Sequence, residues 1–485
     1  METAAGAAAP SAQPATIEHR LAATAATRPR GRVHMQRMHV SFRTASGGGG
    51  PSISTASCGI GSGARATGAV FRSSVAIAPA ALNCTRARRA MPHAGTCRRS
   101  RPEAINMHGA TTPIPRSPAM TSRERLLCAL RGEPTDRVPI STYELVGWNP
   151  DAWENKEPSY RDLMDFIRAS ADCIYMWDSG GVDIAPELLQ VERREEDGVL
   201  VTRTVCRAPR GPLTKVTREA PNLKTVWQVE HLLKTPGDIR NFLETPLAVA
   251  PPDGAEYRRR AAALGENGIM MHSISDALCL TSELFSFQDF LLFCATEPEL
   301  IRRLLDMMQG RVLAYTEALL ATGFGPLFRI CGPEYATPPY LPPERFREYV
   351  VAYDATLIDL IHRHGACARV HCHGRIAQVL DAILELGPDG LDPVEPPPDG
   401  DLALAEVKER TRGRVTLFGN LELKALEHGS ADEVEDLTRR ALRDGMPGGR
   451  FVIMPTAAPI GIPLSPGTEE NYRRYIETAL KHGAY

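Results

Sequence analysis

Short apolar runs recur along the chain from residue 138 onward, and longer stretches with helical spacing separate many of them. Continuous apolar runs of this length are typical of strands buried on both faces. The stretches at 297–322, 343–364, 376–386, 402–411 and 431–444 repeat apolar residues every three or four positions, which predicts amphipathic helices. Alternating strands and helices predict a parallel α/β fold, and eight strands close a (β/α)8 TIM barrel. The eight predicted strands are residues 138–143, 172–177, 269–274, 326–331, 366–371, 390–394, 415–419 and 451–455.

One stretch between the second and third predicted strands has a different period. Residues 198–219 alternate apolar and polar side chains around the turn residues Ala208-Pro-Arg-Gly-Pro212, and a short run rich in valine follows at 226–229. Alternation around a turn of this composition predicts antiparallel hairpins. We therefore expect a β-hairpin insertion near the barrel mouth.

The first 119 residues differ in composition from the rest of the chain. They contain fifteen Arg, no Lys and only three acidic residues, Glu2, Glu18 and Glu103. Because they show no helical or strand period, residues 1–119 are predicted to be a disordered low-complexity extension. Their composition fits a translation start placed too far upstream, which we favour, and it also fits a targeting segment. The barrel domain is expected to span residues 120–485 and to open with a helix at 121–131, capped by Thr121 or Ser122.

The charge and cysteine content narrow the class of protein. A net charge of -2 and a pI near 6.7 give no field that would recruit nucleic acid or an anionic membrane, so we expect a small-molecule substrate. The sequence has no apolar stretch long enough to span a membrane, and its cysteines form no CxxC pair. These features predict a cytoplasmic protein with reduced thiols. Barrels of this size often pair through their outer helices, so a homodimer is one expected assembly.

Polar residues follow most of the predicted strands. In a barrel the carboxyl ends of all strands face one mouth, where enzymes of this architecture keep their catalytic groups. The concentration here exceeds what a purely structural barrel requires. These residues are Tyr143, Glu144, Asp178, Ser273, Asp276, Cys331, Glu334, His371, His373, Asp392, Glu395, Asn420 and Thr456.

Two of these residues, His371 and His373, lie two positions apart at the end of a predicted strand, so both imidazoles point to the same side. Two converging neutral imidazoles can begin a metal site. The preceding strand ends in Cys331-Gly-Pro-Glu334, and this turn can aim a carboxylate over the barrel axis. His371, His373 and Glu334 are therefore the candidate ligands of zinc or another divalent metal, with one position open. The structural alternatives are core histidines bonded to backbone carbonyls and a Glu334 that caps the following segment.

Two carboxylates and an amide follow the next two strands. Asp392 and Glu395 lie in a proline-rich loop, whose restricted backbone suits a group that transfers protons. Asn420 both donates and accepts hydrogen bonds, which serves to orient a substrate and equally to fix a loop. Asp392, Glu395 and Asn420 are the candidate catalytic residues.

The chain resembles the uroporphyrinogen decarboxylase superfamily at residues 120–139, at His371-Cys-His-Gly374, at Gly419-Asn-Leu421 and in the C-terminal block to Tyr475. The resemblance covers residues 120–485 and implies a TIM barrel. That superfamily contains uroporphyrinogen decarboxylases and cobalamin-linked methyltransferases. The decarboxylases carry an Arg-rich segment near the first strand, whereas residues 140–149 here contain no Arg. The resemblance therefore implies the methyltransferase branch.

The match to that branch is partial at the metal motif. Those methyltransferases use His-x-Cys-Gly and a second cysteine near the last strand. Here His373 stands in the place of the first cysteine, and residues 454–459 contain no cysteine. A ligand set of His371, His373 and Glu334 is harder and keeps the metal a stronger Lewis acid. We therefore expect methyl transfer from a small donor, such as an O-methyl compound, to a corrinoid on a partner protein, with Asp392 or Glu395 managing a proton and Asn420 orienting the substrate.

Two other functions are compatible with the same residues. One is a metal-independent lyase that acts on a carboxylated tetrapyrrole or a small acid, with His371 and Glu395 as acid and base. The other is a protein that holds a corrinoid or porphyrin at the barrel mouth without turnover. Metal content and cofactor binding distinguish these functions from the methyltransferase.

Overall fold

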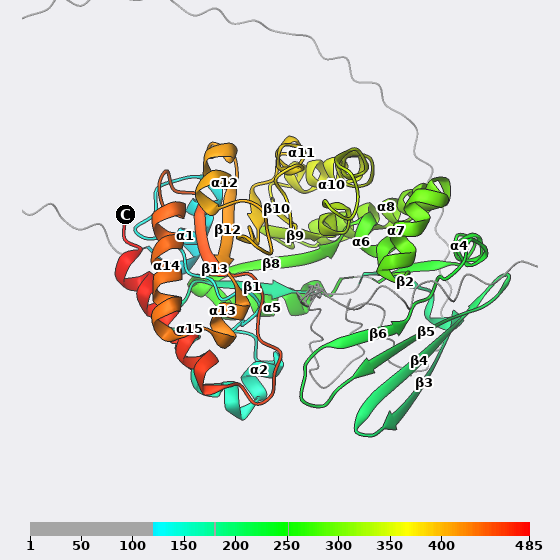
Figure 1. The fold of residues 1–485 in the computed structure, drawn as a ribbon, viewed down its shortest axis with the longest axis horizontal. Coiled ribbons are helices and arrows are strands. Elements are labelled where there is room, and N and C mark those ends of the chain that lie inside the picture. Colours follow the sequence, from blue (N-terminus) through cyan, green and yellow to red (C-terminus); the bar gives the residue numbers. More distant parts are fainter. Residues whose placement is uncertain (1–119, 179–180, 251) are drawn as a thin grey trace, which may run out of the picture. The chain divides into compact units, whose positions relative to one another are not determined.

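Seven parallel strands form the central sheet of the computed structural model, which describes residues 120–178, 181–250 and 252–485 (Figure 1). The predicted extension at 1–119 lies outside the described residues. In the sheet each strand pairs with the next along the chain apart from the insertion, as a parallel barrel requires. The order is β1 (Cys173–Trp177), β8 (Gly268–Ser275), β9 (Leu327–Cys331), β10 (Cys367–His371), β11 (Gly390–Asp392), β12 (Thr416–Leu421) and β13 (Phe451–Pro455).

The first predicted strand, at residues 138–143, is present as a short bridge that lies between β13 and β1. Ile140 pairs with Ile453 in parallel, and the amide of Ser141 donates to the Ile453 carbonyl at 2.9 Å. On the other side, the amide of Asp172 donates to the Ile140 carbonyl at 2.7 Å. The first apolar run therefore joins the two ends of the sheet, and the predicted TIM barrel is confirmed as the fold class.

The helices follow the strands along the chain, as the apolar spacing predicted. Their starts have local causes: Thr121 caps the first helix and Ser430 caps a later one, each in a capping box with the glutamate three residues on. The helices are α1 (Ser122–Arg131), α2 (Trp153–Lys156), α3 (Arg161–Ser170), α4 (Pro236–Phe242), α5 (Gly254–Leu264), α6 (Ala277–Ser282), α7 (Phe287–Thr296), α8 (Pro298–Ala321), α9 (Pro343–Phe346), α10 (Ala352–Arg363), α11 (Leu380–Glu385), α12 (Leu404–Thr411), α13 (Leu423–His428), α14 (Ala431–Gly445) and α15 (Pro466–His482).

The insertion is a four-stranded antiparallel sheet, seen in green beside the barrel in Figure 1. The hairpin predicted at 198–219 is confirmed, and a further strand precedes it. The sheet contacts segments that follow β8 and β13: Leu223 bridges to Gly461, and the Gln228 side-chain amide donates to the Glu283 carbonyl at 3.3 Å. These contacts place the sheet at the carboxyl ends of the barrel strands. Its strands are β3 (Leu189–Glu196), β4 (Val199–Ala208), β5 (Gly211–Glu219) and β6 (Val226–Glu230), and β2 (Val182–Ile184) pairs separately with β7 (Leu247–Val249).

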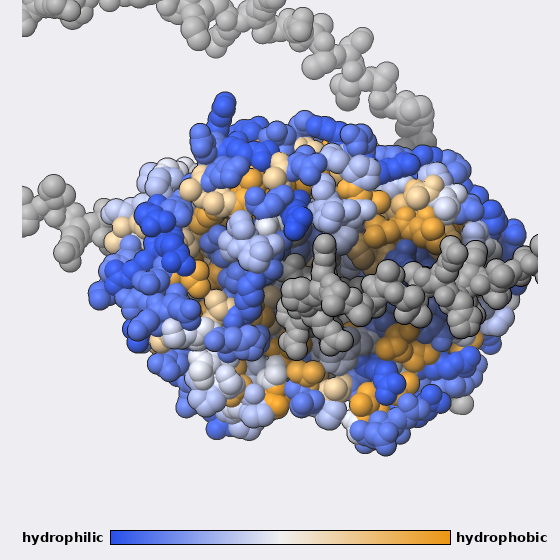
Figure 2. Space-filling model, in the orientation of Figure 1, coloured by the Kyte–Doolittle hydropathy of each residue, from blue (hydrophilic) through white to orange (hydrophobic). Residues whose placement is uncertain are grey.

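The hydrophobic core lies in the barrel and between its strands and helices. Every residue of β9 and of β13 is buried, including Arg329, the one charged residue of these two strands. The outer face in Figure 2 is largely hydrophilic, with apolar side chains gathered beside α7 and over the insertion sheet. Leu292 on α7 and Val229 on β6 are among the exposed apolar residues. Within residues 120–485, as far as the structure describes them, no helix has the length and apolar character of a membrane span.

Candidate functional site

Three neighbouring strands bring their final residues to the same level of the barrel. His371 pairs with Cys331 on β9 and with Asp392 on β11. Because neighbouring residues in a parallel sheet point to the same face, these three side chains meet at the carboxyl end of the barrel. The structure therefore gathers several of the polar residues that were expected at the mouth.

Asp392 holds His371 and Arg369 together inside the barrel. Its Oδ1 accepts from Arg369 Nε at 2.6 Å, and its Oδ2 accepts from His371 Nδ1 at 2.8 Å. Burial opposes ionisation, but Arg369 and His371 outweigh it and hold the pKa of Asp392 well below its ordinary value. Asp392 is thus a fixed carboxylate that orients His371. Its expected role in proton transfer stays a prediction, and this geometry favours a positioning role.

His371 is neutral because of the partner on its other nitrogen. Arg329 Nη2 lies 2.9 Å from His371 Nε2, and a guanidinium has only donors, so Nε2 must accept. The ring proton is then on Nδ1, where it faces Asp392. Burial, with Arg329 beside the ring, lowers the pKa of His371 to about 3. His371 is therefore uncharged at neutral pH.

His373 forms a second pair, with Glu395. Its Nδ1 donates to Glu395 Oε1 at 2.8 Å, and the other carboxylate oxygen accepts from the Gly374 amide at 2.6 Å. Burial alone lowers the pKa of His373, but the hydrogen bond and the charge of Glu395 raise it above its ordinary value. Burial likewise opposes the ionisation of Glu395, and His373 reverses this effect and lowers the pKa of the carboxyl. The Nε2 atom of His373 has no protein hydrogen-bond partner among the described residues.

Glu334 lies close enough to His373 for their charges to interact, and it is fully buried. Its Oε2 accepts from the Gly332 amide at 3.1 Å, while its Oε1 has no partner within the described part of the chain. Burial raises the pKa of Glu334, and the nearby His373 partly opposes that shift. The turn requires glycine at 332, because a Cβ there would lie 1.9 Å from Asp276 Oδ1. Its φ of +140° is also rarely adopted by other residues.

The expected three-ligand metal site is not assembled in this structure. Among the described residues, no group of three or more His, Cys, Asp or Glu side chains is arranged to hold a metal ion. Both ring nitrogens of His371 already make hydrogen bonds, one with Asp392 and one with the cationic guanidinium of Arg329. The Cys331 thiol is also a poor metal ligand, because burial raises its pKa to about 12 and so disfavours the thiolate. Of the possible ligand atoms on His371, His373 and Glu334, His373 Nε2 and Glu334 Oε1 have no partner among the described residues, so metal binding by these three residues stays a prediction.

Two buried carboxyl groups that the sequence did not pair lie behind the Glu334 turn. Asp276, before α6, and Asp354, on α10, are both fully buried and lie close enough for their charges to interact. Two neighbouring buried carboxyl groups disfavour ionisation of both at once. Burial raises the pKa of Asp354 to about 8, and the pKa of Asp276 is also raised.

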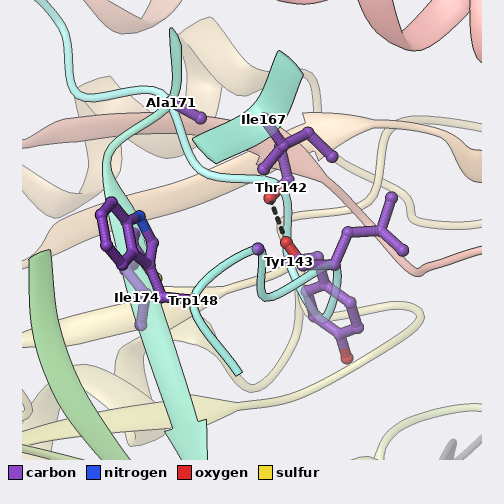
Figure 3. A pocket seen from close by; sticks show the side chains of 9 residues that line it. Thr142, Tyr143, Trp148, Ile167, Ala171 and Ile174 are labelled. Atoms are coloured by element: carbon purple, nitrogen blue, oxygen red, sulfur yellow. Dashed lines mark hydrogen bonds between the residues drawn. The ribbon is translucent and has the colours of Figure 1, made fainter. Parts of the chain in front are cut away.

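Asn420 lies in β12 opposite Met454 of β13, and its side chain is half-buried. It makes no side-chain hydrogen bond with the described residues, so its substrate-orienting role stays a prediction. A small pocket lies beside the first strand segment and not at His373 (Figure 3). Its lining is mostly apolar, and Trp148 and Ile174 lie on one side of it, while the ring of Tyr143 is turned away from them.

Sequence reasoning did not assign Arg329 and Arg369 to the site, although both carry a recognisable signal. Each is a charged residue in an otherwise apolar strand, in Leu-Phe-Arg-Ile-Cys331 and in Cys-Ala-Arg-Val-His371. A buried arginine is rare unless it has a specific partner. The sequence cannot show those partners, because Tyr143 lies 186 positions from Arg329.

Residues 277–479 match the model of the uroporphyrinogen decarboxylase (URO-D) family. This match supports the predicted resemblance to the uroporphyrinogen decarboxylase superfamily. The matched region contains both histidine pairs and the Glu334 turn, so the described site lies in the part of the chain that the URO-D model covers. No curated protein matches the sequence.

Comparison with solved structures supports the barrel fold. A methyltransferase from Methanosarcina mazei is similar at 18% identity with a TM-score of 0.50, and the match covers 75% of this chain and 99% of that one. A D-psicose 3-epimerase from Clostridium cellulolyticum H10, solved with D-tagatose, has 9% identity and a TM-score of 0.29, and the match covers 47% of this chain and 82% of that one. The first likeness shows a shared fold, and the second is too weak to carry an argument.

Proposed function

We propose that this protein transfers a methyl group from a small O-methyl compound to a corrinoid carried by a separate protein. The observation that carries the proposal is His373, which Glu395 holds through Nδ1 while Nε2 has no protein partner among the described residues. An alkoxide leaves an ether slowly unless its oxygen gains a proton as the bond breaks. An oriented imidazolium supplies that proton. The superfamily and the fold shared with a methyltransferase support this direction.

In the proposed step, a residue of this chain supplies the proton that the leaving oxygen needs. The bond between the methyl carbon and the ether oxygen breaks, the electron pair stays on oxygen, and this oxygen takes the Nε2 proton of His373. Glu395 stabilises the charged imidazole before the transfer and accepts from its Nδ1 throughout. The corrinoid, when bound, supplies the nucleophile that receives the methyl group. Product release and uptake of a proton from water return His373 to its charged form.

Methylation of a reduced corrinoid, followed by its absorbance, tests the proposal with a panel of small methoxy compounds. We expect His373→Gln to slow transfer by about 100-fold, the size of a general-acid contribution. His428→Gln is the matched control, because that side chain is 77% exposed on α13. Absence of transfer from every methoxy compound by the wild-type protein would contradict the proposal. Elemental analysis of the wild type, His373→Ala and Glu334→Ala tests the metal prediction separately.

A carboxy-lyase is the second candidate, and the buried Arg329 and Arg369 favour it, because guanidinium groups suit a carboxylated substrate. The lyase expectation used His371 and Glu395 as acid and base, whereas the structure pairs Glu395 with His373. In a lyase, His373 would protonate the carbon that loses carbon dioxide. Release of carbon dioxide without methyl transfer would favour this candidate.

A further inference from the structure

Arg329 is a buried cation whose contacts leave its charge incompletely matched. It is 6% exposed, and Nη2 donates to the Tyr143 hydroxyl at 2.6 Å and to His371 Nε2 at 2.9 Å. The remaining hydrogen bond is a weak one from Nη1 to the sulfur of Met176 at 3.7 Å. All three acceptors are neutral. A buried arginine ordinarily has a carboxylate at hydrogen-bond distance, because an unmatched buried charge costs several kcal/mol.

Asp392 does not fill that place. Its Oδ2 lies 3.9 Å from Arg329 Nε, and the same oxygen already accepts from His371 at 2.8 Å. Its other oxygen accepts from Arg369. Asp392 is the one ion-pair partner that Arg329 has in the described part of the chain, and Arg329 Nε has no hydrogen-bond partner there. Two guanidinium groups therefore share one carboxylate inside the barrel.

Tyr143 adds a second donor beside Arg329. Its oxygen accepts from Arg329, so its own O–H proton remains to be donated, and no acceptor for it lies among the described residues. The Tyr143 ring is turned away from Trp148 in Figure 3, and the Arg329 guanidinium lies 5.3 Å from its centre. Arg329 contacts His371, and Tyr143 contacts Arg329. Both donors therefore lie close to the strand end that carries His373.

We propose that Arg329 and Tyr143 form a carboxylate-binding site, and that the methyl donor is a small methoxy carboxylic acid. The carboxylate would accept from the guanidinium and from the phenol, which are the two donors that the protein leaves without strong acceptors. The methoxy group would extend toward Nε2 of His373. The identity of the donor rests on the proposed function, whereas the anion site itself does not.

Acidic residues farther from Arg329 bear on this charge balance. Glu144 and Asp178 both interact electrostatically with Arg329, although neither makes an ion pair with it. Burial raises the pKa of Asp178 to about 7, so this carboxyl is only partly ionised near neutral pH. A bound carboxylate would thus meet a guanidinium that no ionised group of the described residues contacts at hydrogen-bond distance.

Calorimetric titration of the full chain at pH 6.5 tests the site with a matched pair of probes. Methoxyacetate carries the carboxylate, and 2-methoxyethanol is the neutral equivalent; benzoate and 4-methoxybenzoate extend the series. We expect the carboxylates to bind at least 10-fold more tightly than the neutral ether. Equal binding of the neutral and anionic probes, or no binding of any of the carboxylates at ~10 mM, overturns the site.

Three variants locate the binding energy. Tyr143→Phe removes one hydroxyl and should weaken methoxyacetate binding about 10-fold, as expected for a hydrogen bond to a charged group. Arg329→Met should weaken it beyond detection, and Arg443→Met, 68% exposed on α14, should leave it unchanged. Unchanged affinity in Tyr143→Phe overturns the inference even if Arg329→Met does not fold. Carboxylate binding without methyl transfer would contradict the proposed function and leave the carboxylate site standing. Methyl transfer from neutral ethers without carboxylate binding would contradict the carboxylate site and leave the proposed function standing.

Discussion

Glu395 fixes both the orientation and the charge of His373, which gives activity a defined pH dependence. The pKa of His373 lies above its ordinary value of 6.5, so the acid form is lost as the pH rises through that raised pKa. In Glu395→Gln, burial dominates and the decline should move to lower pH. A histidine-ring NMR titration of both proteins measures the shift without an activity assay. Identical titrations in the two proteins would contradict the assigned pair.

The same pair has a stability consequence with a fixed sign. The raised pKa of His373 contributes stability that is complete below pH 6.5 and is lost as the pH rises through its folded-state pKa. The lowered pKa of Glu395 contributes stability that is complete above 4.5 and is lost as the pH falls through its folded-state pKa. The pair therefore stabilises the fold most strongly between these two values.

Asp354 should make the protein less stable as the pH rises. Its pKa is about 8 in the fold against an ordinary 3.8, so between these values the folded state retains a proton that the unfolded chain has released. The free energy of unfolding then falls by up to ~1.4 kcal/mol per pH unit for that proton. Asp354→Asn, which cannot ionise, should flatten this dependence in urea unfolding at pH 6 and pH 8. Asp359→Asn, on the exposed face of the same helix, is the control and should retain the wild-type slope.

Helix α15 stabilises the seam where the barrel closes. The Tyr475 hydroxyl lies 2.7 Å from the Ser141 carbonyl and 2.9 Å from the Ile453 carbonyl, so it joins the first strand segment to β13. Tyr475→Phe leaves these buried acceptors with one donor fewer, and should reduce the free energy of unfolding by about 1–3 kcal/mol. Tyr353→Phe loses only an exposed hydrogen bond to Asp306 and should cost far less. Equal losses in the two variants, measured by urea unfolding, would exclude a special role for this contact.

Strand β3 shows why local pattern reading missed one element of the insertion. Residues 189–196 begin with alternating apolar and polar residues but end in a charged run, and most of them are exposed. The strand is at the edge of its sheet, and charged side chains on an edge strand discourage pairing with other chains. Pairing with β4 over its whole length fixes it as a strand, and that contact is not visible in its own residues.

The described part of the chain begins with contacts among its own residues. The Met120 amide donates to Asp136 at 3.2 Å, and Arg125 pairs with Asp136 and Asp172 at 2.6 Å each. A chain that starts at Met120 should therefore unfold thermally within about 2 °C of the full chain, the shift of a surface change of ~0.5 kcal/mol. Differential scanning calorimetry of both proteins measures this. A markedly lower midpoint would assign a stabilising role to the removed segment.

The sequence by itself determined the barrel, because each buried parallel strand is an apolar run and each run is a local property of the chain. It also indicated the mouth, since polar residues that follow these runs must gather where parallel strands end. Tertiary structure decided which polar residues meet. It paired Glu395 with His373 across 22 positions, and it placed Arg329 on His371, which engaged a nitrogen that was expected to bind metal. Such pairings depend on strand register and side-chain direction across the barrel, which no local pattern encodes.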